Sequence, residues 1–138
     1  MKIILYLTLF VAILACSKHT TPKKVNKRLT EGSWAITEFI DNEISILKKY
    51  QNVSLGFSDA GNINAISETG ASGSWSVGND KNPTILYLNF PELTDSLHVL
   101  TDDWVVFKLT KDLCILKRNN ISGFNYETSI DQLTLTKK

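Results

Sequence analysis

The chain has 138 residues, which fits one domain and leaves no room for two well-formed cores. Its 15 Lys and Arg residues nearly balance 14 Asp and Glu residues, so the whole chain has no electrostatic reason to bind nucleic acid. Two cysteines are too few for the disulfide framework that stabilises many small secreted domains. The domain must therefore be stabilised by a hydrophobic core.

Residues 1–15 have the pattern of an export signal peptide. Lys2 is followed by an apolar run that ends at Ala15 and is too short to cross a bilayer as a helix. The run closes with the sequence Ile-Leu-Ala-Cys, in which the cysteine is Cys16. The alternative is ordinary cleavage near Ala15 that leaves Cys16 as a free thiol, which an exported chain rarely exposes.

The Ile-Leu-Ala-Cys sequence ending at Cys16 resembles a bacterial lipobox. In lipoproteins with this motif the signal is cut before the cysteine, and the thiol and amino group of that cysteine are acylated. Two or three acyl chains anchor a protein firmly, because each buried methylene contributes about 0.8 kcal/mol. The resemblance therefore implies a protein that is permanently attached to a membrane through Cys16.

Residues 16–28 are predicted to be a lipidated, flexible tether, because they are rich in Lys and Arg and have no apolar period. These cations either contact anionic lipid head groups or only keep a linker soluble. The residues after Cys16 lack the acids that resemble the surface-export signal of some Bacteroidetes lipoproteins. We therefore expect a location in the cell envelope, anchored at the outer membrane and facing the periplasm.

Residues 29–138 are predicted to form an all-β domain. Eight strands are expected at about residues 33–40, 53–58, 63–67, 74–77, 84–90, 104–109, 113–118 and 128–136. In the second of them Val53, Leu55 and Phe57 alternate with serine and glycine, at the period of 2 that is typical of a strand with one buried face. Turn residues at 59–62 then predict a hairpin with the third strand.

A short helix is expected within residues 91–100, because Leu93, Leu97 and Leu100 recur at helical spacing and Pro91 suits a first helical turn. Eight short strands in sequence favour an eight-stranded antiparallel up-and-down barrel, since closure removes the exposed edges of the sheet. A two-sheet sandwich is the alternative, because periodicity alone does not separate the two architectures.

A Gly-x-Trp sequence, Gly32–Trp34, stands at the start of the first strand, as in lipocalins. Together with the lipobox and the stretches Gly73–Val77 and Leu100–Trp104, it resembles the lipocalin-like lipoproteins of Flavobacteria and other Bacteroidetes. The resemblance covers effectively the whole mature domain and implies a lipid-anchored barrel with no agreed biochemical activity. Lipocalins bind small hydrophobic molecules, and their final strand ends in an arginine that lies over the motif tryptophan. The final strand here ends in lysines, so Arg28 or Arg118 would have to take that role.

Two groups of side chains are candidates for function. Gly32 and Trp34 are predicted to close one end of the barrel, with Ile36 and Ile40 on the same face as Trp34. The residues predicted to line a ligand site are Leu55, Phe57, Trp75, Leu88, Phe107 and Leu133. Large inward side chains are more often simply core, because an eight-stranded barrel encloses a space that side chains can fill.

The clusters that catalysis needs are not visible in the sequence. His98 could be paired with Cys114 or Ser96 as a catalytic dyad, but an exposed histidine on a helix is the commoner case. Asp102 and Asp103 have no histidine or third acid at metal-ligand spacing. We therefore expect no enzyme, metal or cofactor. The chain either binds a small hydrophobic or amphipathic ligand, or is a packed barrel that contacts an envelope protein partner through residues 126–128 or the segment near His98.

Overall fold

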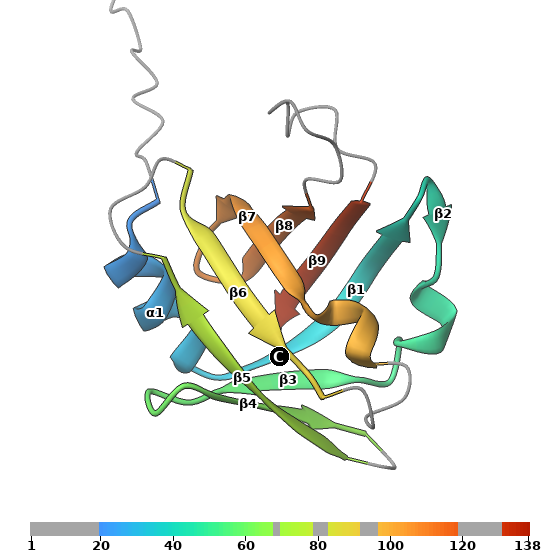
Figure 1. The fold of residues 1–138 in the computed structure, drawn as a ribbon, viewed down its shortest axis with the longest axis horizontal. Coiled ribbons are helices and arrows are strands. Elements are labelled where there is room, and N and C mark those ends of the chain that lie inside the picture. Colours follow the sequence, from blue (N-terminus) through green and yellow to red (C-terminus); the bar gives the residue numbers. More distant parts are fainter. Residues whose placement is uncertain (1–19, 68–69, 79–82, 92–96, 119–130) are drawn as a thin grey trace, which may run out of the picture.

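The computed structural model describes residues 20–67, 70–78, 83–91, 97–118 and 131–138, which form a closed β-barrel preceded by one α-helix (Figure 1). The predicted signal peptide, Cys16 and the predicted contact region at residues 126–128 lie outside this part of the chain. Within the residues given above, no helix is long and apolar enough to cross a membrane.

Eight antiparallel strands form the barrel. They are β1 (Ser33–Asp41), β3 (Ser54–Phe57), β4 (Asn62–Ile66), β5 (Ala71–Val77), β6 (Ile85–Asn89), β7 (Asp102–Leu109), β8 (Leu113–Arg118) and β9 (Asp131–Lys137). Each pairs with the next in chain order, and β1 also pairs with β9. The predicted up-and-down barrel is confirmed, and the sandwich is ruled out because this last pairing closes the sheet. A short strand, β2 (Ile44–Ser45), and a 3-10 helix, η1 (Leu47–Lys49), lie between β1 and β3.

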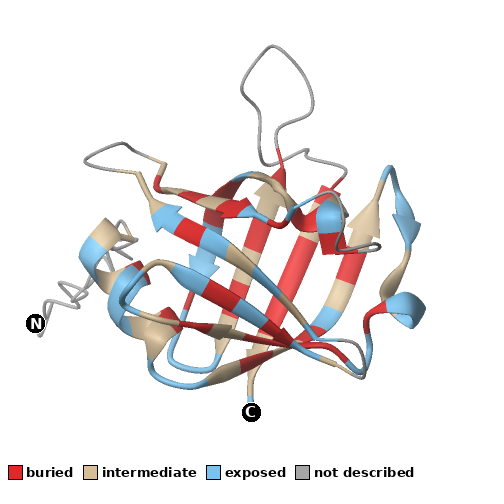
Figure 2. Cartoon of the chain, turned by 60° about the horizontal axis from the view of Figure 1, so that its bottom comes forward, coloured by how far each residue is buried: buried red, intermediate tan, exposed pale blue. Residues whose placement is uncertain are grey.

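Apolar side chains fill the interior and alternate with outward-facing residues along the strands (Figure 2). The largest fully buried side chains include Trp34, Phe39, Phe90 and Trp104. They belong to one continuous core cluster that runs through the barrel. The fold is therefore stabilised by a single core, as the low cysteine count requires.

One predicted site residue, Phe107, faces outward at a β-bulge in β7, as alternation from the inward Trp104 and Val106 requires. The pairing of β7 with β8 shifts register between Val106 and Lys108, so the residue between them is added to the strand without a partner. Phe107 is that residue, and it is 44% exposed, with the Lys117 Nζ 3.9 Å from its ring centroid. The prediction that Phe107 lines an interior ligand site is therefore wrong.

A second bulge lies in β1, where pairing with β9 shifts register between Ile36 and Glu38. Beyond the bulge Phe39 is fully buried, whereas Ile40 is only partly buried. The predicted inward set of Trp34, Ile36 and Ile40 is thus wrong in its last member, because strict alternation fails at the extra residue.

The helix α1 (Pro22–Thr30) occupies most of the segment for which the sequence predicts a flexible tether. Thr21 is its N-cap and accepts a hydrogen bond of 3.3 Å from the Lys24 backbone N–H. Val25 and Leu29, one helical turn apart, are fully buried. The prediction of flexibility is wrong for these residues, because two apolar side chains at helical spacing dock the helix on the barrel.

The helix lies across the end of the barrel at which β1 begins (Figure 1). It contacts β1, β3 and β5, and the Thr84 hydroxyl, just before β6, donates a hydrogen bond to the Thr20 carbonyl oxygen. Of the helix expected within residues 91–100, the structure shows a 3-10 turn at residues 97–100, whereas residues 92–96 are not described. This turn lies at the opposite end of the barrel, where β7 begins.

Gly73 in β5 lies against the backbone at the end of β6. A Cβ at this position would overlap the Asn89 carbonyl oxygen, whereas a Cβ at Gly56 in β3 would come no nearer to the Asn64 carbonyl oxygen than 4.0 Å. Only glycine therefore fits at position 73 without a shift of the backbone.

Candidate functional site at the two ends of the barrel

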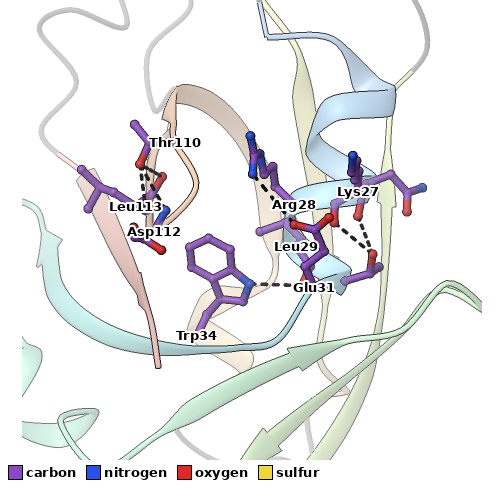
Figure 3. Close-up of polar contacts among 10 residues, drawn as sticks. Lys27, Arg28, Leu29, Glu31, Trp34, Thr110, Asp112 and Leu113 are labelled. Atoms are coloured by element: carbon purple, nitrogen blue, oxygen red, sulfur yellow. Dashed lines mark hydrogen bonds and ion pairs between the residues drawn. The ribbon is translucent and has the colours of Figure 1, made fainter.

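Trp34 closes the barrel beneath α1. It is fully buried, and its Nε1–H donates a hydrogen bond of 3.1 Å to the Leu29 carbonyl oxygen in α1 (Figure 3). Lys137 of β9 is its cross-strand partner and places Nζ 5.9 Å from the Trp34 ring centroid. Gly32 has a φ of 151°, and a Cβ there would lie 3.0 Å from the Lys137 Cε. The glycine therefore lets the chain turn from helix to strand while the lysine stem passes beside it.

The cation over Trp34 is thus a lysine. Arg28 instead has its Nη1 3.9 Å from the Glu31 Oε2, and Arg118 lies at the other end of the barrel. The prediction that Arg28 or Arg118 covers Trp34 is wrong. The reason is register, because the strand neighbour directly opposite Trp34 is Lys137.

The opposite end, which we call the mouth, is closed by the same kind of contact. Trp104 at the start of β7 is fully buried, and its Nε1–H donates a hydrogen bond of 2.9 Å to the Leu100 carbonyl oxygen. Arg118 of β8 is its cross-strand partner, with Cζ 4.4 Å from the Trp104 ring centroid. A tryptophan therefore ties the preceding helical segment to the barrel at both ends, and a cation from the neighbouring strand covers its ring.

The two closures come from similar stretches of sequence. Leu29-Thr30-Glu31 precedes Trp34, and Leu100-Thr101-Asp102 precedes Trp104. In both strands the bulge follows at the same distance after the tryptophan. Sequence analysis missed this internal similarity, although the repeated Leu-Thr-acid triplet before a tryptophan is a signal that could have revealed it.

Arg118 is held at the mouth by two carboxylates and a backbone carbonyl. Its Nε lies 3.1 Å from the Asp131 Oδ2, its Nη1 lies 3.4 Å from the Asp102 Oδ2, and Nη1 also donates a hydrogen bond of 3.1 Å to the Val99 carbonyl oxygen. The Asp131 Oδ1 accepts a hydrogen bond of 2.8 Å from the Asn42 backbone N–H. Because two acids face one guanidinium, this part of the mouth does not attract anions.

Three aromatic rings, those of Phe39, Tyr50 and Trp104, pack together at the mouth, and Arg118 lies over the ring of Trp104. Phe39 has its ring centroid 5.2 Å from that of Tyr50 and 6.3 Å from that of Trp104. Burial raises the pKa of Tyr50, and the nearby Asp41 carboxylate raises it further. The side chains of Leu97 and Leu100, from the 3-10 turn, are buried within the same core cluster.

The other predicted ligand-lining residues point inward. Leu55, Phe57, Trp75, Leu88 and Leu133 are all buried and belong to the core cluster. They are spread along the barrel, since Leu55 is paired with Trp34 at one end and Leu133 with Phe39 toward the other. Their contact with a ligand stays a prediction.

A pocket of about 320 Å³ lies at the α1 end. It is lined by Asn26, Asp59, Ala60, Gly61, Trp75, Ser76 and Val77, which come from α1, the β3–β4 turn and β5. The Trp75 Nε1–H donates a hydrogen bond of 3.0 Å to the Ser58 carbonyl oxygen, so the polar edge of its indole is already bound. This pocket is lined by the turn and the helix and is separate from the mouth.

Of the two dyads considered, His98 and Cys114 lie apart, whereas Ser96 lies outside the described residues. His98 is in the turn at the mouth, where its Nδ1 is 2.9 Å from the Phe90 carbonyl oxygen, whereas Cys114 pairs with Leu109 near the α1 end. Burial raises the pKa of the Cys114 thiol to about 12, so it is protonated at neutral pH. Among the residues that the structure describes, no group of three or more His, Cys, Asp or Glu side chains could hold a metal ion.

The whole fold is similar to the crystal structure of a DUF4847 family protein from Bacteroides vulgatus, with a TM-score of 0.54 and 11% sequence identity. The likeness covers 81% of this chain and 96% of that chain. At this identity it supports the fold alone. No protein-family model and no curated protein matches the chain.

Proposed function

We propose that this protein is a lipoprotein of the cell envelope, anchored through Cys16 at the periplasmic face of the outer membrane, whose barrel binds a small apolar or amphipathic ligand at the mouth. The observation that carries the ligand proposal is the placement of Leu97 and Leu100. Their side chains extend from a single 3-10 turn into a core that is continuous with the aromatic rings of Phe39 and Trp104.

The mouth is the end better suited to opening. At the other end a nine-residue helix is held by the Thr84 hydroxyl at one terminus and the Trp34 indole at the other. Each closure buries two side chains, but the turn at residues 97–100 is less than half as long as the nine-residue helix and has fewer internal backbone hydrogen bonds to break, so we expect it to open at lower free energy. Outward movement of residues 97–100 would leave an apolar space for a ligand tail, and the surplus of carboxylates around Arg118 suits a neutral or cationic head group.

Titration of the purified protein with the apolar fluorophore N-phenyl-1-naphthylamine tests this proposal. The double variant Leu97→Ala/Leu100→Ala should bind the probe roughly tenfold more tightly, because each 1.4 kcal/mol by which the closed turn is destabilised raises the open population tenfold. The matched variant Val25→Ala/Leu29→Ala weakens the other closure and should not tighten binding. A folded protein that shows no saturable binding in any of these forms would overturn the ligand proposal.

The second candidate function is a packed barrel that serves as a structural or interaction subunit of an envelope complex. Two large apolar side chains are the candidate contacts for such a partner, because Ile44 in β2 is 67% exposed and Ile66 in β4 is 61% exposed. Crosslinking in the native envelope should then capture one protein partner, and Ile44→Ser or Ile66→Ser should reduce the yield. Recovery of the crosslinked protein without any partner would count against this role.

The anchor has its own test. Cys16→Ala should abolish membrane fractionation and labelling by fatty-acid analogues, because Cys16 is the residue proposed to be acylated. Unchanged fractionation of this variant would overturn the lipoprotein proposal and leave the ligand proposal standing.

A further inference from the structure

Charge is distributed unevenly between the two ends of the barrel. Among the described loops and strand termini, the α1 end has seven basic and three acidic side chains, namely Lys23, Lys24, Lys27, Arg28, Lys111, Lys137 and Lys138 against Glu31, Asp59 and Asp112. The mouth has three basic and four acidic side chains, namely Lys48, Lys49 and Arg118 against Asp41, Glu43, Asp102 and Asp131. The α1 end therefore has four more basic than acidic side chains, whereas the mouth has one more acidic than basic side chain.

The helix presents its cations away from the barrel. Val25 and Leu29 are buried against the core, so the opposite face of α1 points to solvent. Lys23 and Lys27 lie on that opposite face and are exposed. The Arg28 Nη1 lies 3.9 Å from the Glu31 Oε2. Both side chains are partly exposed, so this ion pair neutralises little of the positive charge at the α1 end.

We propose that the α1 end of the barrel docks on an anionic phospholipid surface and so holds the mouth away from the membrane. The proposal rests on the acylation of Cys16 proposed above. The chain from Cys16 to Pro22 can span at most about 20 Å, since an extended residue covers about 3.5 Å. A tether that was flexible up to residue 28 would reach about twice as far, so the folding of α1 brings the basic end close to the lipid.

The charge pattern argues for a lipid surface as the partner. Clusters of four or more Lys and Arg beside a membrane anchor are attracted to anionic leaflets over a distance of roughly one Debye length, about 8 Å in physiological salt. The mouth, with one more acidic than basic side chain, has no such attraction to the same surface. Attraction at the α1 end alone therefore orients the barrel and leaves the mouth accessible from the aqueous side.

Energy transfer to labelled lipid tests this orientation. The acylated protein is placed in vesicles of phosphatidylcholine and phosphatidylglycerol at a ratio of 7 to 3, with a rhodamine-labelled lipid as acceptor. A donor fluorophore is attached at Ala60→Cys, in the β3–β4 turn of the α1 end, or at Ile44→Cys, near the mouth, and both positions are exposed. Cys114 is buried and stays unlabelled in the folded protein.

Transfer from position 60 should exceed transfer from position 44 at least twofold. The difference should disappear in pure phosphatidylcholine vesicles and in 0.5 M KCl. Lys23→Gln/Lys27→Gln should also remove it, whereas the matched variant Lys48→Gln/Lys49→Gln, with two exposed lysines near the mouth, should leave it unchanged.

The outcomes separate this inference from the proposed anchor. Equal transfer from the two positions, in protein whose mass includes the acyl chains, would overturn the docking proposal alone. A mature protein without acyl chains on Cys16 would overturn the anchor, and docking would then have to appear as salt-sensitive flotation of the unacylated chain with the same anionic vesicles. Absence of that flotation would overturn docking as well.

Discussion

The ion pair between Arg118 and Asp131 should make the two side chains depend on each other for stability. Replacing Arg118 alone should therefore lower the free energy of unfolding more than replacing both side chains together. Both side chains are almost fully buried, at 9% and 2% exposure. Arg118→Met removes the guanidinium and leaves the Asp131 carboxylate at the mouth with its hydrogen bond from the Asn42 N–H. Loss of one partner of a buried pair costs about 3–5 kcal/mol, and the remaining hydrogen bond places this variant near the lower limit.

The double variant Arg118→Met/Asp131→Asn should recover much of that loss. Asparagine still accepts the hydrogen bond from Asn42, and no uncompensated charge remains. We expect a total loss of about 1–2 kcal/mol for the double variant, so the coupling energy is on the order of 2 kcal/mol. The contact of Arg118 with Asp102 adds little, because the Asp102 side chain is 41% exposed.

Urea unfolding, followed by tryptophan fluorescence, measures the free energy of unfolding of Arg118→Met, of Asp131→Asn and of the double variant. Lys137→Met is the matched control, because it removes the other cation over a tryptophan from a more exposed position. It should lower the free energy of unfolding by less than about 1 kcal/mol. If the losses of the two single variants at the mouth add up to the loss of the double variant, the coupling on which this reasoning depends does not exist.

Three further predictions concern the packing of the barrel. Gly73→Ala should lower the free energy of unfolding by about 2 kcal/mol or more, because its Cβ would overlap a carbonyl of β6, whereas Gly56→Ala should change it by less than about 1 kcal/mol in thermal unfolding. Trp34→Phe should speed hydrogen exchange in α1, because the buried Leu29 carbonyl loses its donor, and unchanged exchange would show that this bond does not hold the helix. Because burial raises the pKa of Cys114 from 9.0 to about 12, its stabilising effect is complete below pH 9 and is lost as the pH rises toward 12, by up to about 1.4 kcal/mol per pH unit. Cys114→Val should lack this part of the alkaline loss, and identical pH profiles for the two proteins would contradict the assignment.

The barrel could be predicted from the sequence because period-2 alternation survives in most strands. Alternation failed beyond the two bulges, where one extra residue brought Phe39 inward in place of Ile40 and Leu109 inward in place of Lys108. The outward direction of Phe107 follows from alternation with the inward Trp104 and Val106, so its assignment to the interior was an error of parity. A bulge depends on pairing with the neighbouring strand, which alternation in one strand does not report.

The closures at the two ends were only partly predictable. Trp34 was identified from its Gly-x-Trp setting, but its covering cation depends on cross-strand register, which places Lys137 opposite it. The helix α1 was missed because Lys and Arg dominate its composition. Thr21 as a possible N-cap before Pro22 was a usable signal for its start.

Native mass spectrometry of the acylated protein, extracted gently from its own envelope, tests most directly whether the barrel binds a ligand. The account predicts a small neutral or cationic molecule that adds mass beyond the acyl chains on Cys16 and is displaced by N-phenyl-1-naphthylamine. A spectrum that contains only the acylated chain, from protein that also fails to bind the fluorophore, would contradict it.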